Sequence, residues 1–485
     1  MVSTILSFFK TLCYHIYMGQ TGLKILFIFP NIRMYVLPLS IARFSSLLKA
    51  EGHTVELFEA THPTLDENPP DRLLDIRGAV MRSDGVSDNL IQKIESYNPD
   101  IIAISLTEAT FPFGLHLLNT IRHYGIPTIV GGVFPTFAPE KVMACEAVHM
   151  ICVGEGEAAL PELCRRMQHG QAYHDIPNLW IRRQGGHIIR NPIAPVINLD
   201  TLPPPDYALF RNTRFYPPHG LIPFETHRGC PYQCTYCNSP ALSALYQKHT
   251  RTCFFRKRSM AAIRKDLDSL TSECIPTHLY FTSDTFLAWS HREFDQFIEI
   301  YSDYKIPFFC NTRPETITPY RMKKLRSVGL AHLSIGLEHG NEKFRREVIR
   351  RRGSNETILK AFDIANDYDV KLSVDNIIGF PGETRELAFD TIRLNHRFEA
   401  DIRNCYIFAP YHGTRLRHLA IEQGYLENDP VCGWLIQESL LNMPQFPKEQ
   451  IWFLKQNFSR YISYQESCWP DIEKETSESP FARDL

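Results

Sequence analysis

The sequence lacks any apolar run as long as the roughly 18 residues that a membrane-spanning helix needs, so we expect no stable membrane insertion. It also lacks an excess of either charge, because 52 lysines and arginines stand against 54 aspartates and glutamates. That balance gives no indication of a nucleic-acid partner. Residues 1–22 are apolar but lack the charged leader and small-residue cleavage site of a signal peptide. We treat them as an N-terminal extension, with translation starting at Met1 or at Met18.

A second CxxC pair is also missing, and ten of the thirteen cysteines stand singly. This pattern argues against a disulfide framework and favours the reducing cytoplasm. The remaining three are Cys230, Cys234 and Cys237, in the string CPYQCTYCN. Three thiolates so placed can hold three irons of a 4Fe-4S cluster and leave the fourth open to a small chelating molecule. The alternative is a zinc site, in which His227 or a distant cysteine would supply the fourth ligand.

Strand-like and helix-like segments alternate between residues 23 and 170. The strands are continuous apolar runs such as 23–30 and 126–132, as in parallel sheets covered on both faces. The alternation predicts a doubly wound, Rossmann-like α/β domain, whose ligands lie beyond the carboxyl ends of the strands. Paired glycines at these ends would let a large planar ligand approach the backbone, although tight turns use glycine as well. The candidate binding residues are Ser105, Leu106, Thr107, Gly131, Gly132, Val133, Glu155 and Gly156.

Residues 171–220 change character and are predicted to link two domains. They contain a β-hairpin pattern that turns at Gly185 and Gly186, followed by the extended, proline-rich segment 199–210. The alternation of strands and helices then resumes over residues 221–425. Six βα units are expected, which form an incomplete, TIM-like barrel. Residues 426–485 carry amphipathic pieces and a charged end, and predict a short helical region with a tail.

The ends of the predicted barrel strands carry polar groups. Asp284 follows the second strand, Arg313 the third and Glu338 the fourth, while the motifs GFPGET and APYHGT follow the fifth and the sixth. Structural interpretations of these residues stay open. Glu338 could pair with a surface arginine, and Asp284 could cap a helix.

The CxxxCxxC loop with an aromatic residue before its last cysteine resembles the signature of the radical S-adenosylmethionine (radical SAM) enzymes. In that family the cluster reduces bound S-adenosylmethionine and cleaves it to a 5′-deoxyadenosyl radical. The resemblance covers residues 221–425 and implies that Glu338 bonds the ribose or the methionine part, while Arg351 or Arg352 meets the carboxylate. The residues that the resemblance places at the cofactor are Tyr236, Asp284, Glu338, Arg351, Gly379, Phe408 and Ala409.

In the N-terminal third, the strings ISLT, VGGVFPT and VGEGE resemble the cobalamin-binding domain that is fused to some radical SAM domains. The resemblance covers residues 23 to about 170. Many cobalamin domains carry DxHxxG after the first strand, whereas this loop reads PNIRMYVLPLS and contains no histidine. The resemblance therefore implies cobalamin bound without a histidine ligand to cobalt. A degenerate domain that has lost the cofactor is the alternative.

Together the two resemblances imply a cobalamin-dependent radical SAM methyltransferase that methylates an unactivated carbon of a small-molecule intermediate. Cyclisation, oxidation or rearrangement without net methyl transfer is the first alternative, because relatives with this layout catalyse such reactions. A non-catalytic cobalamin or redox sensor is the second. The enzyme would need an electron donor such as flavodoxin or ferredoxin.

Overall fold

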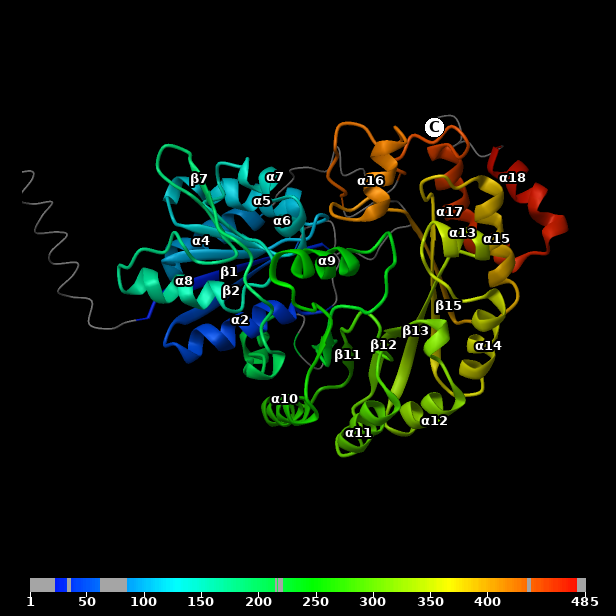
Figure 1. Cartoon of the computed structure of the whole chain (residues 1–485), viewed down its shortest axis with the longest axis horizontal. Helices are drawn as coiled ribbons and strands as arrows, with labels where there is room; N and C mark the ends of the chain where they lie inside the picture. The colour runs from blue at the N-terminus through cyan, green and yellow to red at the C-terminus, as the bar shows by residue number, and fades with distance from the viewer. Residues whose placement is uncertain are drawn as a thin grey trace, which may run out of the picture.

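The computed structural model describes residues 22–32, 36–61, 85–213, 216, 221–433 and 438–477. Two α/β units lie side by side, the N-terminal one in blue and cyan and the C-terminal one in green to red (Figure 1). The predicted N-terminal extension, the start-codon alternatives and the last eight residues of the tail lie outside the described residues.

The N-terminal unit is a parallel sheet with helices on its faces, as predicted. Its strands are β1 (Lys24–Asn31), β2 (Thr54–Thr61), β3 (Ile101–Ser105), β4 (Thr128–Gly131) and β5 (Met150–Cys152), and they pair in the order β2-β1-β3-β4-β5. Every residue of β1 after the first is buried, which explains its unbroken apolar sequence. The helices are α2 (Leu39–Ala50), α4 (Val86–Tyr97), α5 (Phe111–Ile121), α6 (Val133–Phe137), α7 (Pro139–Met143) and α8 (Ala159–Gln168).

The segment predicted as a linker forms more structure than expected. Its hairpin, β6 (Leu179–Arg182) and β7 (Ile188–Arg190), pairs antiparallel with β5 and so extends the N-terminal sheet to seven strands. Gly185 and Gly186 both have φ of 85°, as the predicted turn requires. In the proline-rich part, the Tyr207 hydroxyl donates to the Pro223 carbonyl at 2.9 Å. This part is therefore packed between the two units rather than loose.

The C-terminal unit is an open parallel sheet of six strands in sequence order, which confirms the incomplete barrel. The strands are β8 (Ile222–Phe224), β11 (Leu279–Phe281), β12 (Phe308–Thr312), β13 (Leu330–Glu338), β14 (Lys371–Ile378) and β15 (Ile402–Ile407). The helices that cover them are α10 (Met260–Glu273), α11 (His291–Tyr301), α12 (Pro319–Ser327), α13 (Glu342–Glu347), α14 (Asn355–Asn366) and α15 (Arg385–Asn395). A short ladder, β9 (His227–Arg228) with β10 (Arg256–Lys257), flanks the cysteine loop.

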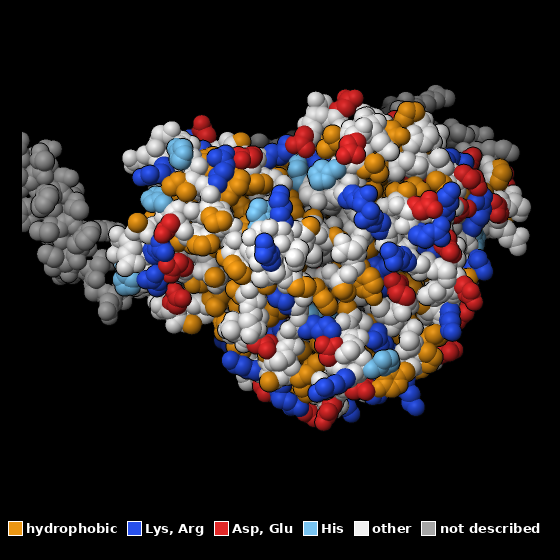
Figure 2. Space-filling model, viewed as in Figure 1, with side chains coloured by type: hydrophobic (Ala, Val, Ile, Leu, Met, Phe, Trp, Pro, Cys, Tyr) orange, Lys and Arg blue, Asp and Glu red, His pale blue; other side chains and the backbone are white. Residues whose placement is uncertain are grey.

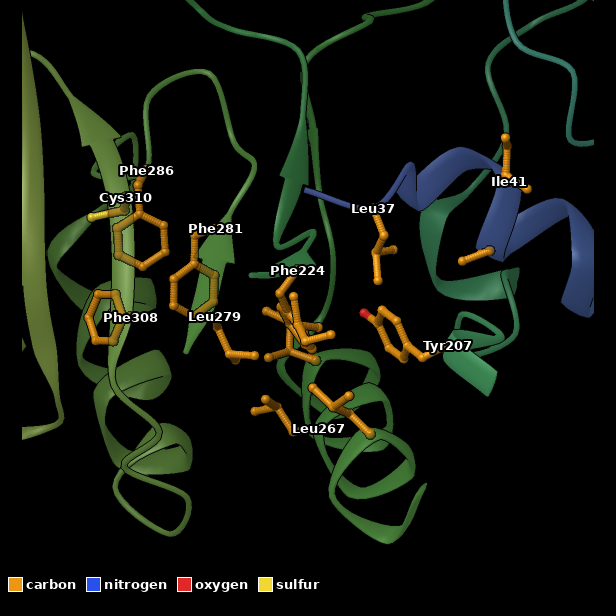
Figure 3. Close-up of a cluster of buried hydrophobic side chains, with 14 of the residues drawn as sticks. Leu37, Ile41, Tyr207, Phe224, Leu267, Leu279, Phe281, Phe286, Phe308 and Cys310 are labelled. Carbon is orange, nitrogen blue, oxygen red and sulfur yellow. The ribbon is translucent and has the colours of Figure 1, made fainter. Parts of the chain in front are cut away.

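One hydrophobic core runs from the barrel into the N-terminal unit. Phe281 and Phe308 of the barrel strands belong to the same cluster as Tyr207 and as Ile41 of α2. Figure 3 shows these side chains as a continuous row between the strands and helices of both units. Burial of apolar surface on this scale fixes the orientation of the two units, because separating them would expose the row to water.

The remaining helices close the C-terminal side. These are α9 (Asn238–Thr250), α16 (Arg415–Glu422), α17 (Lys448–Ser463) and α18 (Trp469–Ser477). Ile451 and Leu454 of α17 pack with Ile378 and Ile407 of β14 and β15. The C-terminal helices therefore cover the outer face of the last strands. No helix among the described residues is long and apolar enough to cross a membrane. Basic and acidic side chains are interspersed over the face shown in Figure 2.

Candidate cofactor sites

The three predicted cysteines lie in the loop that leads from β9 into α9, and none of them forms a disulfide. Cys237 is the N-cap of α9, where its sulfur accepts a hydrogen bond from the Ser239 amide at 3.4 Å. Cys234 is buried, and the Nη1 atom of Arg313 donates to its sulfur at 3.2 Å. Burial raises the pKa of Cys230, with a contribution from Cys234, and it raises the pKa of Cys237 to about 12, with contributions from Cys234 and Cys230. The three sulfurs are therefore close enough to influence one another electrostatically.

The loop offers the right kind of ligand for an iron–sulfur cluster, namely three free thiols, but their side chains are not arranged around one metal position. Across the described residues, no three His, Cys, Asp or Glu side chains converge closely enough to hold a single metal ion. The nearest acidic neighbour of the thiols, Asp284, accepts from the Ser239 hydroxyl, and burial raises its pKa. Among the described residues, Asp284 thus caps no helix and has no basic partner. Thiols are the ligands that iron–sulfur clusters use, and Arg313 donates a hydrogen bond to one of them.

A buried pair of opposite charges lies at the end of β13. The Glu338 carboxylate accepts from Arg351 Nη1 at 2.8 Å, and the same guanidinium donates to the Tyr236 hydroxyl at 3.3 Å. Glu338 has a φ of 67°, at a register irregularity between β13 and β14, so its backbone is held in the left-handed region. A Cβ added to Gly336 would come within 2.5 Å of the Glu338 carboxylate, which the sequence alone did not indicate. The structure therefore brings together Glu338, Arg351 and Tyr236, three residues that the sequence singled out.

The GFPGET loop is fixed by a carboxylate of its own. Glu383 accepts from the amides of Gly379 and Phe380 at 2.6 and 2.8 Å, and His339 Nε2 lies 3.1 Å from its other oxygen. Gly379 has a φ of 83°, which explains glycine at the start of the turn. The Phe408 side chain is buried in the C-terminal core with Phe380, and Ala409 follows it at the end of β15.

A cavity of about 370 Å³ lies at the carboxyl edge of the N-terminal sheet. Six of the predicted binding residues line it: Ser105, Gly131, Gly132, Val133, Glu155 and Gly156. Leu106 and Thr107 do not. Leu106 is buried, and its backbone lies so close to Gly132 that a Cβ there would clash with it. The Thr107 amide donates to the Thr110 hydroxyl at 3.0 Å within the turn.

The surroundings of Gly131 show whether this glycine is needed for a tight turn or leaves room for a ligand. A Cβ at Gly131 would approach only the Cys152 Cβ, at 4.0 Å, and Gly131 does not have a positive φ. Neither close packing nor backbone conformation within the protein therefore requires glycine at this position. The space that the missing Cβ leaves open belongs to the cavity, so the residues present fit a large group that approaches the backbone there.

The cavity also touches the barrel through an ion-pair network. Arg228 Nη1 lies 2.8 Å from Glu155 and 2.6 Å from Glu157, and its Nε lies 2.8 Å from Glu225. Burial opposes the ionisation of Glu155, but Arg256 and Arg228 outweigh it and hold the pKa of Glu155 below its usual value. The carboxylate that the sequence suggested as a cofactor contact is thus held by arginines of the barrel. Because Arg228 precedes Cys230 by two residues, the network joins the cavity to the cysteine loop.

A second contact between the units was missed by sequence reasoning. Glu108, in the turn after β3, accepts from the backbone amides of His412 and Cys432 at 2.9 and 2.8 Å, and lies 2.7 Å from His412 Nδ1. In Figure 1 the loop that leads into α16 lies beside α6, where the His412 ring contacts Phe134. Burial raises the pKa of Glu108, but these hydrogen bonds more than reverse the effect and leave it lowered.

We expect Glu108→Gln to weaken this contact by about 2 kcal/mol at neutral pH, because a charge-assisted set of hydrogen bonds is lost. Since the pKa of the folded state is lowered, the stabilisation is present above the unfolded pKa and is lost as the pH falls through the folded pKa. Urea unfolding at pH 7 and in acid measures both effects, with Glu140→Gln, an exposed surface pair with Arg190, as the control. Equal midpoints for the two variants at pH 7 would contradict the assignment.

Comparison with family models identifies the class. Residues 224–394 match the model of the radical SAM superfamily, and residues 26–164 match that of the B12-binding domain. The chain therefore contains a B12-binding domain followed by a radical SAM domain. Its cofactors are accordingly a 4Fe-4S cluster, S-adenosylmethionine and cobalamin.

Among its relatives, the chain is 26% identical to an uncharacterised methyltransferase of Pyrococcus horikoshii, over 76% of this chain and 80% of that protein. It is 22% identical to an anaerobic magnesium-protoporphyrin IX monomethyl ester cyclase of Rubrivivax gelatinosus, over 80% of this chain and 68% of that one. Its fold is similar to that of the radical S-adenosylmethionine methyltransferase TsrM from Kitasatospora setae. That match has a TM-score of 0.65 and 16% identity, and covers 84% of this chain and 78% of the other.

Proposed function

We propose that this protein is a cobalamin-dependent radical SAM methyltransferase that acts on an unactivated carbon of a small molecule. The observation that carries the proposal is the position of Arg228, which lines the cavity at the N-terminal strand ends and lies two residues before the first cysteine of the loop. Two cofactor sites joined in this way can serve one substrate between them. The match to the Pyrococcus horikoshii methyltransferase supports the choice of methyl transfer.

Each cofactor has candidate residues in the described chain. Cys230, Cys234 and Cys237 would hold the cluster, while Ser105, Gly131 and Gly132 would hold cobalamin. When bound, the cluster would supply the electron that cleaves S-adenosylmethionine to a 5′-deoxyadenosyl radical, and cobalamin would carry the methyl group. The protein contributes position: Arg313 donates to the Cys234 sulfur, and the continuous core keeps the two units in fixed orientation.

The Glu338–Arg351 pair would bind S-adenosylmethionine. Both side chains are buried and each offers a polar group beyond their mutual bond, since a carboxylate accepts several hydrogen bonds and a guanidinium donates five. Gly379 and Ala409, at the ends of the neighbouring strands, would lie along the adenosyl group. In this arrangement Tyr236 links the pair to the cysteine loop through Arg351.

We expect Gly336→Ala to lower the affinity for S-adenosylmethionine by about tenfold while the cluster is retained. The added Cβ would come within 2.5 Å of the Glu338 carboxylate and displace it, at a cost of about 1–3 kcal/mol. Equilibrium dialysis with the reconstituted protein measures the affinity, and the visible absorbance of the cluster is the internal control. Gly353→Ala, where a Cβ meets only Glu315 at 3.7 Å, is the matched variant. An affinity equal to that of Gly353→Ala would contradict the role of the pair.

Cyclisation or oxidation without methyl transfer is the second candidate, and the match to the Rubrivivax gelatinosus cyclase over 80% of this chain favours it. A test with methyl-labelled S-adenosylmethionine separates the two. The anaerobically reconstituted protein is reduced, and the label is followed after gel filtration. Methyl transfer predicts label that coelutes with the protein-bound corrinoid. Formation of 5′-deoxyadenosine without such label would favour the cyclase-like alternative, and neither product would indicate a sensor.

We further propose that an acidic electron carrier of the flavodoxin or ferredoxin kind docks beside the cysteine loop in the cytoplasm. The Thr235 amide donates to the Ile349 carbonyl at 3.1 Å, so the loop contacts the segment that continues into Arg350 and Arg352. Both arginines are exposed. Charge complementarity accelerates such encounters and depends on salt.

We expect the double variant Arg350→Glu/Arg352→Glu to slow reduction by flavodoxin at least tenfold at low salt. Reduction by dithionite should stay unchanged, because a small reductant needs no docking surface. Stopped-flow absorbance of the cluster measures both rates. A loss of rate with dithionite, or none with flavodoxin, would contradict the surface.

A further inference from the structure

The two faces of the barrel sheet differ in polarity. Leu279, Phe281, Phe308 and Leu333 face the helices and are buried in the core. The strand register puts a second set of residues on the opposite, inner face. This inner set includes Tyr280, Asn311, Ser334, Asp375, Asn404 and Tyr406. Polar side chains on the face without helices indicate a surface that contacts something other than protein core.

Asp375 is the acidic residue of this inner set, and it lies on β14, next to the edge strand β15. Its carboxylate accepts from the Ser334 hydroxyl at 2.6 Å and from the Asn404 amide at 2.9 Å, and it is hydrogen-bonded to the Tyr406 hydroxyl. All three partners are neutral. Asp375 is only partly buried, and no lysine, arginine or histidine among the described residues forms an ion pair with it, whereas the buried carboxylate of Glu338 is paired with Arg351. Neutral donors orient the carboxylate without compensating its charge.

The carboxylate lies next to the proposed chemistry. Asp375 is the register partner of Gly336 on β13, and its charge acts on Glu338 two residues further along. Tyr406, its neighbour on β15, is 51% exposed, so this part of the face opens to solvent. The Arg351 charge is matched by Glu338 and is therefore not free for Asp375. A ligand on this part of the inner face would meet a carboxylate that is held by neutral hydrogen-bond donors.

We propose that Asp375 binds a cationic nitrogen of the substrate, so that the enzyme acts on small molecules that carry a protonated amine or a similar group. The assignment rests on the proposed function, because it places the substrate between the two cofactor sites. Asp375 is then the residue that makes the enzyme select positively charged substrates over uncharged ones. Ser334 and Asn404 position it, since each holds one of its oxygens.

The test uses benzylamine and its uncharged analogue benzyl alcohol as probes of the reconstituted enzyme with S-adenosylmethionine. Ligand-observed NMR titration gives both dissociation constants. We expect the wild type to prefer the amine by about tenfold, as one charge-assisted hydrogen bond in a partly buried site provides. Asp375→Asn keeps the shape and should remove the preference. Asp369→Asn, at an exposed aspartate paired with Arg326, should retain it.

The readouts also separate a role toward S-adenosylmethionine from one toward the substrate. If Asp375→Asn weakens the binding of S-adenosylmethionine as much as that of benzylamine, the carboxylate serves the cofactor and the assignment is overturned. Equal affinity of the wild type for the amine and the alcohol overturns it as well. Formation of 5′-deoxyadenosine is measured on the same samples. Its absence from the wild type would refute the proposed function, while an amine preference that depends on Asp375 would still support the binding site.

Discussion

Cys234→Ser is expected to eliminate the iron–sulfur cluster and to reduce 5′-deoxyadenosine formation to background. Cys234 is the most buried of the three cysteines, at 7% exposure, and it is the one whose sulfur receives the Arg313 hydrogen bond. A serine hydroxyl is a poor ligand for cluster iron, since thiolates are the ligands these clusters use. With one of the three ligands lost, two sulfurs remain, and we expect them to be too few to retain the 4Fe-4S cluster.

The measurement is made on anaerobically reconstituted protein, as iron and acid-labile sulfide per chain and as product formed with dithionite. Cys253→Ser and Cys468→Ser are the matched controls, because both cysteines are exposed and lie outside the loop. They should keep full cluster content. A wild-type protein with stoichiometric zinc and no sulfide, or a Cys234→Ser variant with normal turnover, would refute the cluster assignment.

Gly131→Leu is expected to prevent cobalamin retention while the protein still folds and still cleaves S-adenosylmethionine. The side chain would project into the cavity of about 370 Å³, where the nearest protein atom to its Cβ is 4.0 Å away. Overpacking against a bound corrinoid costs about 3 kcal/mol, which is roughly a hundredfold in affinity. The empty cavity, by contrast, accommodates the leucine without strain.

The corrinoid absorbance per chain after desalting gives the retention, and the thermal midpoint of the cofactor-free protein reports folding. Gly353→Ala serves again as a variant with an added Cβ outside the cavity. Gly132 is unsuitable for this purpose, because a Cβ there would meet the Leu106 backbone and would disturb the fold itself. Stoichiometric cobalamin in Gly131→Leu would show that the cofactor does not approach the backbone at this strand end.

Local pattern was sufficient for much of the fold. The alternation of apolar strands with periodic helices predicted both sheets and their parallel order, and the glycine pair predicted the hairpin turn at Gly185 and Gly186. These features depend on residues that are close in sequence, so the spacing of the apolar and turn residues indicates the local backbone structure directly. The hairpin's membership of the N-terminal sheet was not predicted, because strand pairing with β5 depends on packing rather than on the turn.

The sequence by itself determined the chemistry that the chain can offer: three thiols in one loop, glycines at strand ends, and polar groups after each barrel strand. Only the tertiary structure decided which of these residues share a site. It turned Leu106 and Thr107 away from the cavity, tied Glu155 to Arg228, and joined Glu108 to His412 across 304 positions of the chain. The physical reason is that such contacts form only after two hydrophobic surfaces have merged into one core, and the geometry of that core is set by the packing of residues far apart in sequence.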